Sequence, residues 1–306
     1  MDLDDARSAW RTHGYVVLPG FLSASALAPA LQELEQVHPT PDGFHDRTDP
    51  RSERYQGDEF AGIASFPFAS AELSLLAVHD RLVELAQCLL QDEHVRIYGA
   101  ECWAKFTGAA DYDQPLHRDY LNHTLLTPAL DTTHQQVEMF VYLLDVPEEL
   151  GPPHLVSTQH TRHLPAKPNW YPRTDTGGDP TGVVAPQGSP ELYAAEVSAA
   201  GPAGTVVAFH PGTFHRGTEL RAPRGTRYSM QVCYRPAAVE WGQRTGWASS
   251  SHEAGWYRFV GRATPRQLAL FGFPPPGHTY WTSGSLAAAA QRYPDLDLGP
   301  WHDALA

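Results

Sequence analysis

A histidine and an aspartate stand two residues apart in the segment LHRDY, residues 116–120, which follows an apolar run and a polar loop. In an extended chain alternate side chains point to the same side, so those of His117 and Asp119 would lie next to one another. An imidazole and a carboxylate in that arrangement can take two adjacent positions around a metal ion. Because this short pattern also arises by chance, it becomes informative only together with a third ligand.

The third ligand is expected from His215 in the segment TVVAFHPGTFHRG, where an apolar strand runs into a turn. His215 lies far downstream of His117 and Asp119, which leaves enough chain for a sheet to return and bring the two segments together. Two histidines and one carboxylate leave the other positions of an iron ion open for a bidentate co-substrate and O2. We therefore expect His117, Asp119 and His215 to bind Fe(II).

A cation for the co-substrate is expected from Arg227, which opens the strand-like segment RYSMQVCYR. Side chains alternate between the two faces of a strand. One face then carries Arg227, Ser229, Gln231 and Cys233, and the other Tyr228, Met230, Val232 and Tyr234. A buried guanidinium beside a hydroxyl can hold a carboxylate through two parallel hydrogen bonds. Arg227 and Ser229 are the expected contacts, with Lys105 as a further one; exposure of either cation to solvent is the alternative.

Other polar residues near the predicted ligands are candidates for substrate binding. They are Tyr120, Asn122, His123 and His210. His160 is a candidate for orienting a metal ligand. Loop residues near a site are often functional, although hydrogen bonding within the loops accounts for these residues equally well. Arg221 and Arg224 lie in the turn-like segment LRAPRG, and we expect both to be solvated.

Two kinds of periodicity divide the chain. In its first part apolar residues recur every three or four positions, which predicts helices. We expect helices over 3–12, from Ser23 or Ser25 through residue 34, and over 71–90, with a strand over 15–18 and a loop over 42–70. From residue 95, β-rich runs alternate with Pro, Gly and Asp clusters. We expect strands over 95–106, 137–146, 154–159, 203–209 and 228–234.

This pattern predicts a mainly β fold, an antiparallel barrel or jelly roll with the N-terminal helices packed outside. The chain is expected to be a single domain, 1–306. Its expected parts are a helical cover (1–93), a β-rich core (94–236) and an aromatic, Pro-rich C-terminal wrap (237–306) that contains a short helix near 286–292. The segment 165–190 is expected to act as a lid or substrate loop, because long loops in compact domains are commonly functional.

Composition excludes several classes of partner. The net charge is −13 without any block of Lys or Arg, so nucleic acids and anionic membranes should be repelled, and a small-molecule substrate is favoured over a long acyl-CoA. No apolar run approaches a membrane span and no secretory signal is visible, so a cytoplasmic location is expected. Cys88, Cys102 and Cys233 form no CxxC pair and are expected to be small buried residues. The oligomeric state stays open.

The order of LHRDY, VEMFVYLLDV, the turn at Gly151, HLVSTQH, VVAFHPGTFHRG and RYSMQVCY resembles the phytanoyl-CoA dioxygenase family over residues 14–235. The resemblance implies a cupin-like double-stranded β-helix in which His117, Asp119 and His215 bind iron. It also implies that Arg227 binds the C5 carboxylate of 2-oxoglutarate. The family's usual Glu-Asn-Gly and Pro-Gly-Ser-His segments are replaced here by Glu-Leu-Gly at 149–151 and Ser-Thr-Gln-His at 157–160, which bears on the substrate.

The implied reaction uses Fe(II), 2-oxoglutarate and O2, releases succinate and CO2, and hydroxylates an unactivated C–H bond of a small organic molecule. Halogenating relatives lack the carboxylate, so Asp119 favours hydroxylation, with desaturation and ring closure left open. One alternative is a non-oxidative cupin isomerase or lyase, although such proteins usually present His-x-His and a glutamate. The other is a relative that binds small molecules without catalysis.

Overall fold

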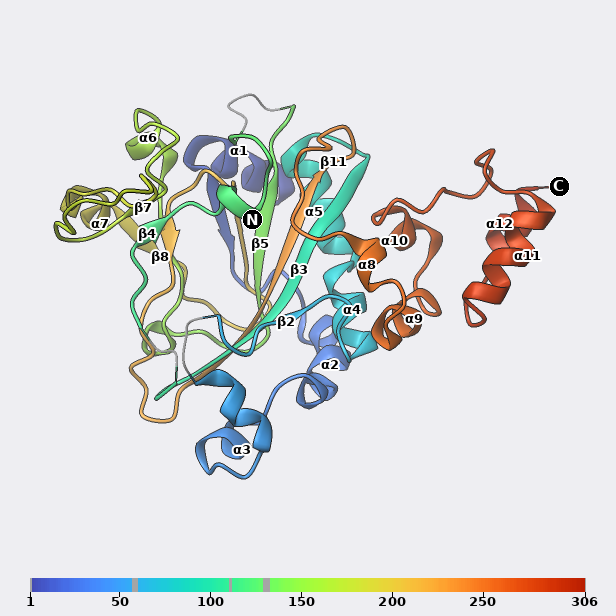
Figure 1. Cartoon of the computed structure of the whole chain (residues 1–306), viewed down its shortest axis with the longest axis horizontal. Helices are drawn as coiled ribbons and strands as arrows, with labels where there is room; N and C mark the ends of the chain where they lie inside the picture. Colours follow the sequence, from blue (N-terminus) through green and yellow to red (C-terminus); the bar gives the residue numbers. More distant parts are fainter. Residues whose placement is uncertain (1, 57–59, 110–111, 129–132, 306) are drawn as a thin grey trace.

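The computed structural model describes residues 2–56, 60–109, 112–128 and 133–305. Within these ranges the chain is mainly β, with two antiparallel sheets and helices around them (Figure 1). The larger sheet has the strand order β1-β9-β5-β11-β3-β2 and the smaller one β7-β4-β10-β6-β8. The larger sheet contains β1 (Tyr15–Leu18), β2 (Ala64–Ser65), β3 (Val95–Phe106), β5 (Val137–Tyr142), β9 (Val206–Phe209) and β11 (Thr226–Pro236). The smaller sheet contains β4 (Leu116–His117), β6 (His154–Val156), β7 (Trp170–Tyr171), β8 (Glu196–Ser198) and β10 (His215–Arg216).

Helices precede, interrupt and follow the strands. The N-terminal ones are α1 (Leu3–His13), α2 (Ala24–Gln32), α3 (Pro41–His45), α4 (Ala71–Ala77) and α5 (Asp80–Leu90). Between the strands lie α6 (Thr158–Thr161), α7 (Pro190–Ala194) and four short 3-10 turns, η1 (Leu34–Gln36), η2 (Pro50–Tyr55), η3 (Tyr120–Asn122) and η4 (Glu148–Leu150). The chain closes with α8 (Trp247–Ser250), α9 (Ala254–Val260), α10 (Pro265–Ala269), α11 (Ser283–Arg292) and α12 (Gly299–Asp303).

Capping side chains explain where the observed helices differ from the predicted ones. Ser23, rather than Ser25, caps α2 by accepting a backbone hydrogen bond. The helix predicted over 71–90 is two helices, because His79 has an extended backbone and caps α5 with its ring nitrogen. The region 42–70, predicted as loop, contains η2 and β2 and most of α3. The strand predicted over 154–159 ends at Val156, since Ser157 caps α6.

The two faces of the larger sheet have different environments. One face of β11 joins the main apolar core through Tyr228, Met230, Val232 and Tyr234. The other face lines a cavity through Arg227, Ser229 and Gln231. Neighbouring strands alternate in the same way: Ala104 of β3 and Met139 of β5 belong to the core, whereas Lys105 and Phe140 line the cavity. The strand alternation predicted for residues 227–234 is therefore observed.

The segments after β11 add aromatic side chains to the same core, among them Trp256 and Trp301. In Figure 1 α8–α10 lie beside the larger sheet, while α11 and α12, in red, lie at one end of the molecule next to the C-terminus. The segment 165–190 is not a plain loop, because it contains β7, which pairs with β4. No helix in the described ranges is long and apolar enough to cross a membrane.

Candidate metal centre

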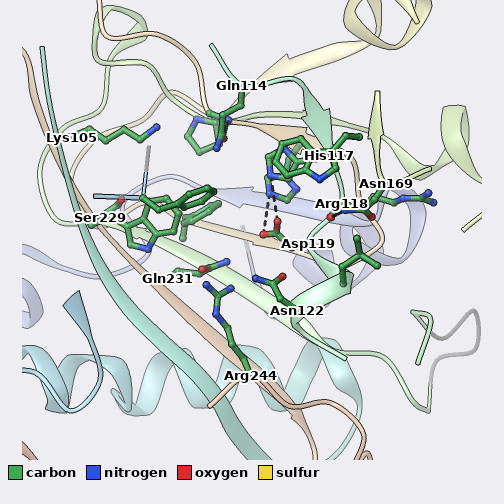
Figure 2. Close-up of a pocket in the computed structure, with 18 of the residues that line it drawn as sticks. Lys105, Gln114, His117, Arg118, Asp119, Asn122, Asn169, Ser229, Gln231 and Arg244 are labelled. Atoms are coloured by element: carbon green, nitrogen blue, oxygen red, sulfur yellow. Dashed lines mark hydrogen bonds and ion pairs between the residues drawn. The ribbon is translucent and has the colours of Figure 1, made fainter. Parts of the chain in front are cut away.

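Strands β4 and β10 bring two histidines together. His117 and His215 are Cα partners across this antiparallel pair, and Asp119 follows β4. Asp119 Oδ1 lies 3.4 Å from His117 Nε2, and Asp119 Oδ2 lies 3.3 Å from His215 Nε2 (Figure 2). One ligand atom from each residue lies within 4.8 Å of the others. The three residues predicted as iron ligands thus surround a common point.

The backbone at Asp119 differs from the expectation of an extended chain. Asp119 has φ −86° and ψ −1°, so the strand has already turned there. The carboxylate nevertheless reaches both imidazoles. The contact expected from the two-residue spacing is therefore present, although the chain is no longer extended at Asp119 itself.

Backbone carbonyls fix the orientation of both imidazoles. Nδ1 of His117 donates to the carbonyl of Pro115 at 2.9 Å, and Nδ1 of His215 donates to the carbonyl of Thr213 at 3.1 Å. With Nδ1 protonated, each Nε2 presents a lone pair to the shared point, as a metal-binding imidazole must. These are the orienting contacts that were expected from His160; that residue is instead exposed on α6.

The electrostatics of the triad suit a cation. Burial opposes ionisation of Asp119, but the imidazoles of His215 and His117 outweigh it and hold the pKa of Asp119 well below its usual range. Burial likewise opposes the charge on His215, yet Asp119 raises the pKa of that imidazole. The carboxylate of Asp119 and the imidazole of His215 therefore stabilise each other's charged form. Two imidazole nitrogens and one carboxylate are a donor set that fits Fe(II) and leaves room for further ligands.

A cavity opens beside the triad and extends along the inner face of β11. Its walls include the aromatic side chains of Phe60, Trp103, Phe140, Tyr142 and Trp170. Trp170 stacks on the imidazole of His117, with ring centroids 4.1 Å apart. Its polar lining includes Lys105, Gln114, Asn122, Asn169, Arg227, Ser229, Gln231 and Arg244. This combination of aromatic walls and a few convergent polar groups is typical of a small-molecule site.

Arg227 is buried in this cavity. Its Nη1 donates a long hydrogen bond, 3.4 Å, to the carbonyl of Leu150, and no carboxylate of the described residues forms an ion pair with it. Burial lowers the pKa of Arg227 to about 10, so it stays charged at neutral pH. Arg221 and Arg224 are exposed, as expected, and Arg224 forms ion pairs with Asp42 of α3 and with Asp46, which follows that helix.

A buried guanidinium without an acidic partner is electrostatically incomplete and suits an incoming carboxylate. Ser229, two residues further along β11, also lines the cavity. Lys105 is the Cα partner of Arg227 on β3, and its ammonium lies 4.7 Å from the ring centroid of Tyr112. The structure therefore places the three predicted co-substrate residues together.

The sequence matches the model of one protein family, described as phytanoyl-CoA dioxygenase (PhyH), over residues 10–227. The chain belongs to the phytanoyl-CoA dioxygenase family. The matched region contains His117, Asp119 and His215 and ends at Arg227. No curated protein sequence matches the chain.

Several solved structures resemble the fold. The epimerase SnoN in complex with Fe3+, alpha ketoglutarate and nogalamycin RO is 22% identical, covers 77% of this chain and 84% of its own, and has a TM-score of 0.54. The carbocyclase SnoK from nogalamycin biosynthesis is 20% identical, covers 76% of this chain and 83% of its own, and has a TM-score of 0.52. HygX from Streptomyces hygroscopicus with nickel, 2-oxoglutarate and hygromycin B bound is 17% identical, covers 76% of this chain and 87% of its own, and has a TM-score of 0.50. At these identities the likeness concerns the fold.

Only one of the four residues predicted to contact the substrate lines the cavity. Asn122 lines the cavity, but Tyr120, His123 and His210 do not. Tyr120 donates its hydroxyl to the carbonyl of Ala166 at 2.7 Å and so faces the loop. His123 is fully buried beneath the cavity. His210 packs near Trp10, and burial lowers its pKa to about 4.

Arg118, between His117 and Asp119 in sequence, attaches the segment 165–190 to β4. Its Nη2 donates to the carbonyls of Pro165, Ala166 and Pro168 at 2.8, 2.6 and 2.6 Å. The side chain of Asn169 donates back to the carbonyl of Arg118. The start of the segment is therefore bound directly to the chain that follows β4.

Sequence reasoning missed a buried group beneath the cavity that consists of His123, Glu138 and Cys233. It also missed Arg244, which reaches the cavity from the expected C-terminal wrap. Glu138 is the one charged residue of the apolar run VEMFVYLL. A single carboxylate in such a run indicates a buried side chain that needs a polar partner, and this could have identified it. Burial raises the pKa of Glu138, while His123 opposes this shift.

Proposed function

We propose that this protein is an Fe(II)- and 2-oxoglutarate-dependent oxygenase that hydroxylates a C–H bond of a small organic molecule. The observation that carries the proposal is the convergence of His117, Asp119 and His215 at the wall of a cavity that also contains the buried Arg227. The fold proposed with it is a cupin-like double-stranded β-helix, built from the two facing sheets. One apolar cluster contains both Ala6 and Trp301, which supports a single domain.

When bound, Fe(II) with 2-oxoglutarate and O2 supplies the oxidising power and yields succinate and CO2. The protein's part is to hold and enclose the reactants. His117, Asp119 and His215 would hold the iron, while Arg227 and Ser229 would bind the distal carboxylate of 2-oxoglutarate. Phe140 and Trp170 would keep water away from the reacting centre.

The substrate is proposed to be a small molecule. The cavity's mixture of aromatic walls and single polar groups supports this, as do nogalamycin RO and hygromycin B in the related structures. The segment 165–190 is proposed to form part of the substrate site, because Asn169 and Trp170 line the cavity.

The test is succinate formation by purified protein supplied with Fe(II), 2-oxoglutarate, ascorbate and a panel of small molecules. We expect slow succinate release that one class of compound stimulates, and no release by the His117→Ala variant. Arg224→Ala is the control, since Arg224 is exposed and distant from the cavity lining. Absence of 2-oxoglutarate turnover in the wild type would favour a non-oxidative cupin enzyme or a binding protein.

A second outcome at the same site is rearrangement of the substrate without net oxygen insertion. Similarity to structures of an epimerase and a carbocyclase favours considering it. Mass spectrometry of the product separates the cases: hydroxylation adds one oxygen atom, ring closure or desaturation removes two hydrogens, and epimerisation leaves the mass unchanged. Incorporation of label from 18O2 into the product would identify hydroxylation.

A further inference from the structure

Three polar side chains gather in the cavity across from the metal triad. Figure 2 shows the guanidinium of Arg244 and the amides of Gln231 and Asn122 close together below Asp119. They come from different parts of the chain: Gln231 from β11, Asn122 from η3, and Arg244 from the segment before α8. We call Gln231 and Arg244 the cavity floor.

Arg244 is fixed in place by its neighbours. Its Nη2 lies 2.9 Å from each carboxylate oxygen of Glu101, so the charge of the guanidinium is neutralised locally. Gly99 provides the room for this side chain, because a Cβ atom there would lie 3.3 Å from Arg244 Cδ. The floor therefore presents N–H donors with little net charge.

The contact between Arg244 and His123 determines the tautomer of the imidazole. Arg244 Nη1 donates to His123 Nε2, and a guanidinium has donors only. Nε2 must therefore be the unprotonated nitrogen, and Nδ1 must carry the proton. His123 Nδ1 lies 3.1 Å from Oε1 of Glu138, within ion-pair distance, and 3.4 Å from the hydroxyl of Tyr98.

The same chain of contacts orients the amide of Gln231. Glu138 Oε2 accepts a hydrogen bond from Gln231 Nε2 at 2.8 Å. Because the amide nitrogen is directed at Glu138, the carbonyl oxygen of Gln231 is directed away from it. Among the described residues no partner is found for that oxygen, and Gln231 lines the cavity. The floor thus offers one acceptor, from Gln231, beside the donors of Arg244.

His123, Glu138 and Cys233 also have the composition of a metal site, with ligand atoms within 4.8 Å of one another. The tautomer argues against that role. A metal on His123 Nδ1 would leave the ring proton on Nε2, where it would oppose the N–H of Arg244. Contacts that hold the floor avoid this conflict: the short distance between His123 and Glu138, and the hydrogen bond from Gln231 to Glu138.

We infer that Gln231 and Arg244 bind a neutral, hydroxyl-bearing ring of the substrate, such as a sugar or cyclitol, and this rests on the proposed function. A hydroxyl both donates and accepts, so it can donate to the Gln231 carbonyl and accept from Arg244. A carboxylate can only accept; it would face the Gln231 oxygen, and Glu101 already neutralises Arg244. Trp103 and Phe140, which flank the floor on β3 and β5, offer apolar surface to the C–H face of such a ring.

The inference makes Glu138 and His123 positioning residues. Neither lines the cavity, but together they fix which end of the Gln231 amide the substrate meets. A site built to bind a substrate hydroxyl rejects analogues that lack it, because its buried polar groups are then left unpaired.

The experiment measures binding without turnover. The protein is loaded with Ni2+ and 2-oxoglutarate, and binding is followed by ligand-observed NMR. The probes are methyl hexopyranosides and inositols, with the matching deoxy sugars and hexuronates for comparison. We expect a neutral polyol to bind, and the deoxy and uronate counterparts to bind about tenfold more weakly or worse. Glu138→Gln and Gln231→Leu should weaken the polyol about tenfold while the Kd for 2-oxoglutarate stays unchanged. Arg224→Ala should change neither.

Circular dichroism checks folding, and if Glu138→Gln does not fold, Gln231→Leu carries the test. Preferential binding of uronates, absence of binding by every polyol, or wild-type affinity for the polyol in both variants would each overturn the inference. Two equivalents of metal per chain, reduced to one by Cys233→Ser, would also overturn it in favour of a second metal site. If the wild type binds neither Ni2+ nor 2-oxoglutarate, that result would instead contradict the proposed function.

Discussion

Trp170 lies nearly parallel to the imidazole of His117, with an interplanar angle of 16° and ring centroids 4.1 Å apart. The two residues are also Cα partners in the β4–β7 pair. The segment 165–190, expected to be a lid or substrate loop, therefore packs through Trp170 on the imidazole of His117. A substitution at Trp170 should for this reason affect the candidate metal site.

Removing the indole should loosen the metal site. Trp170→Ala is expected to weaken iron binding about tenfold, the lower end of the effect of losing groups that support metal ligands. Trp170→Phe keeps an aromatic ring and should retain most of the affinity. Iron binding is measured by competition with a chelator. Equal affinities for wild type and Trp170→Ala would show that the stack does not support His117.

Arg227 is predicted to anchor 2-oxoglutarate. Arg227→Ala should raise the apparent KM for 2-oxoglutarate by about one to two orders of magnitude, because a buried charge-assisted pair is lost. Arg221→Ala and Arg224→Ala are matched controls, since both side chains are exposed. If Arg224→Ala shows the larger increase instead, the anchor has been assigned to the wrong arginine.

The alternation of β11 was predictable because a strand has a strict two-residue period, which separates the face of Arg227 from that of Tyr228. The proximity of His117, Asp119 and His215 was predictable because these residue types are rare together and lie in recognisable segments. The position of Arg244 was not predictable, since it comes from irregular chain with no period to follow. The break at His79 was missed because an apolar pattern continues across it, and only the cap shows that the helix restarts.

Acyl-CoA thioesters are predicted not to be substrates. Four cations line the cavity, a cluster that the sequence does not show because its members are far apart: Lys105, Arg118, Arg227 and Arg244. Two of them are already engaged, Arg118 with backbone carbonyls and Arg244 with Glu101. We therefore expect phytanoyl-CoA to leave succinate release unchanged. Stimulation at micromolar concentration would show that these cations do hold phosphate groups.

An ion pair between β10 and β8 makes the free energy of unfolding depend on pH. Arg216 donates to both carboxylate oxygens of Glu196 at 2.8 Å. Burial opposes ionisation of Glu196, but Arg216 and His154 outweigh it and lower the pKa to about 2, below the ordinary 4.5. The stabilisation is therefore complete above pH 4.5 and is lost as the pH falls toward 2.

Glu196→Gln should lower the free energy of unfolding at pH 7 by about 1–3 kcal/mol, and the difference from wild type should shrink below pH 4.5. Urea denaturation at a series of pH values measures this difference. Glu149→Gln, at an exposed glutamate, is the control and should change little. A difference that does not vary with pH would mean that the carboxylate's charge does not contribute.

We predict that His117, Asp119 and His215 bind one iron ion per chain. The most direct measurement is the iron content of anaerobically reconstituted protein, determined together with succinate release for wild type and the His117→Ala/His215→Ala double variant. His163→Ala serves as the control, since that histidine is exposed. We predict one iron per chain in wild type and control, with neither tight iron binding nor succinate release in the double variant. A double variant that still binds iron tightly and releases succinate would show that His117 and His215 are not the iron ligands.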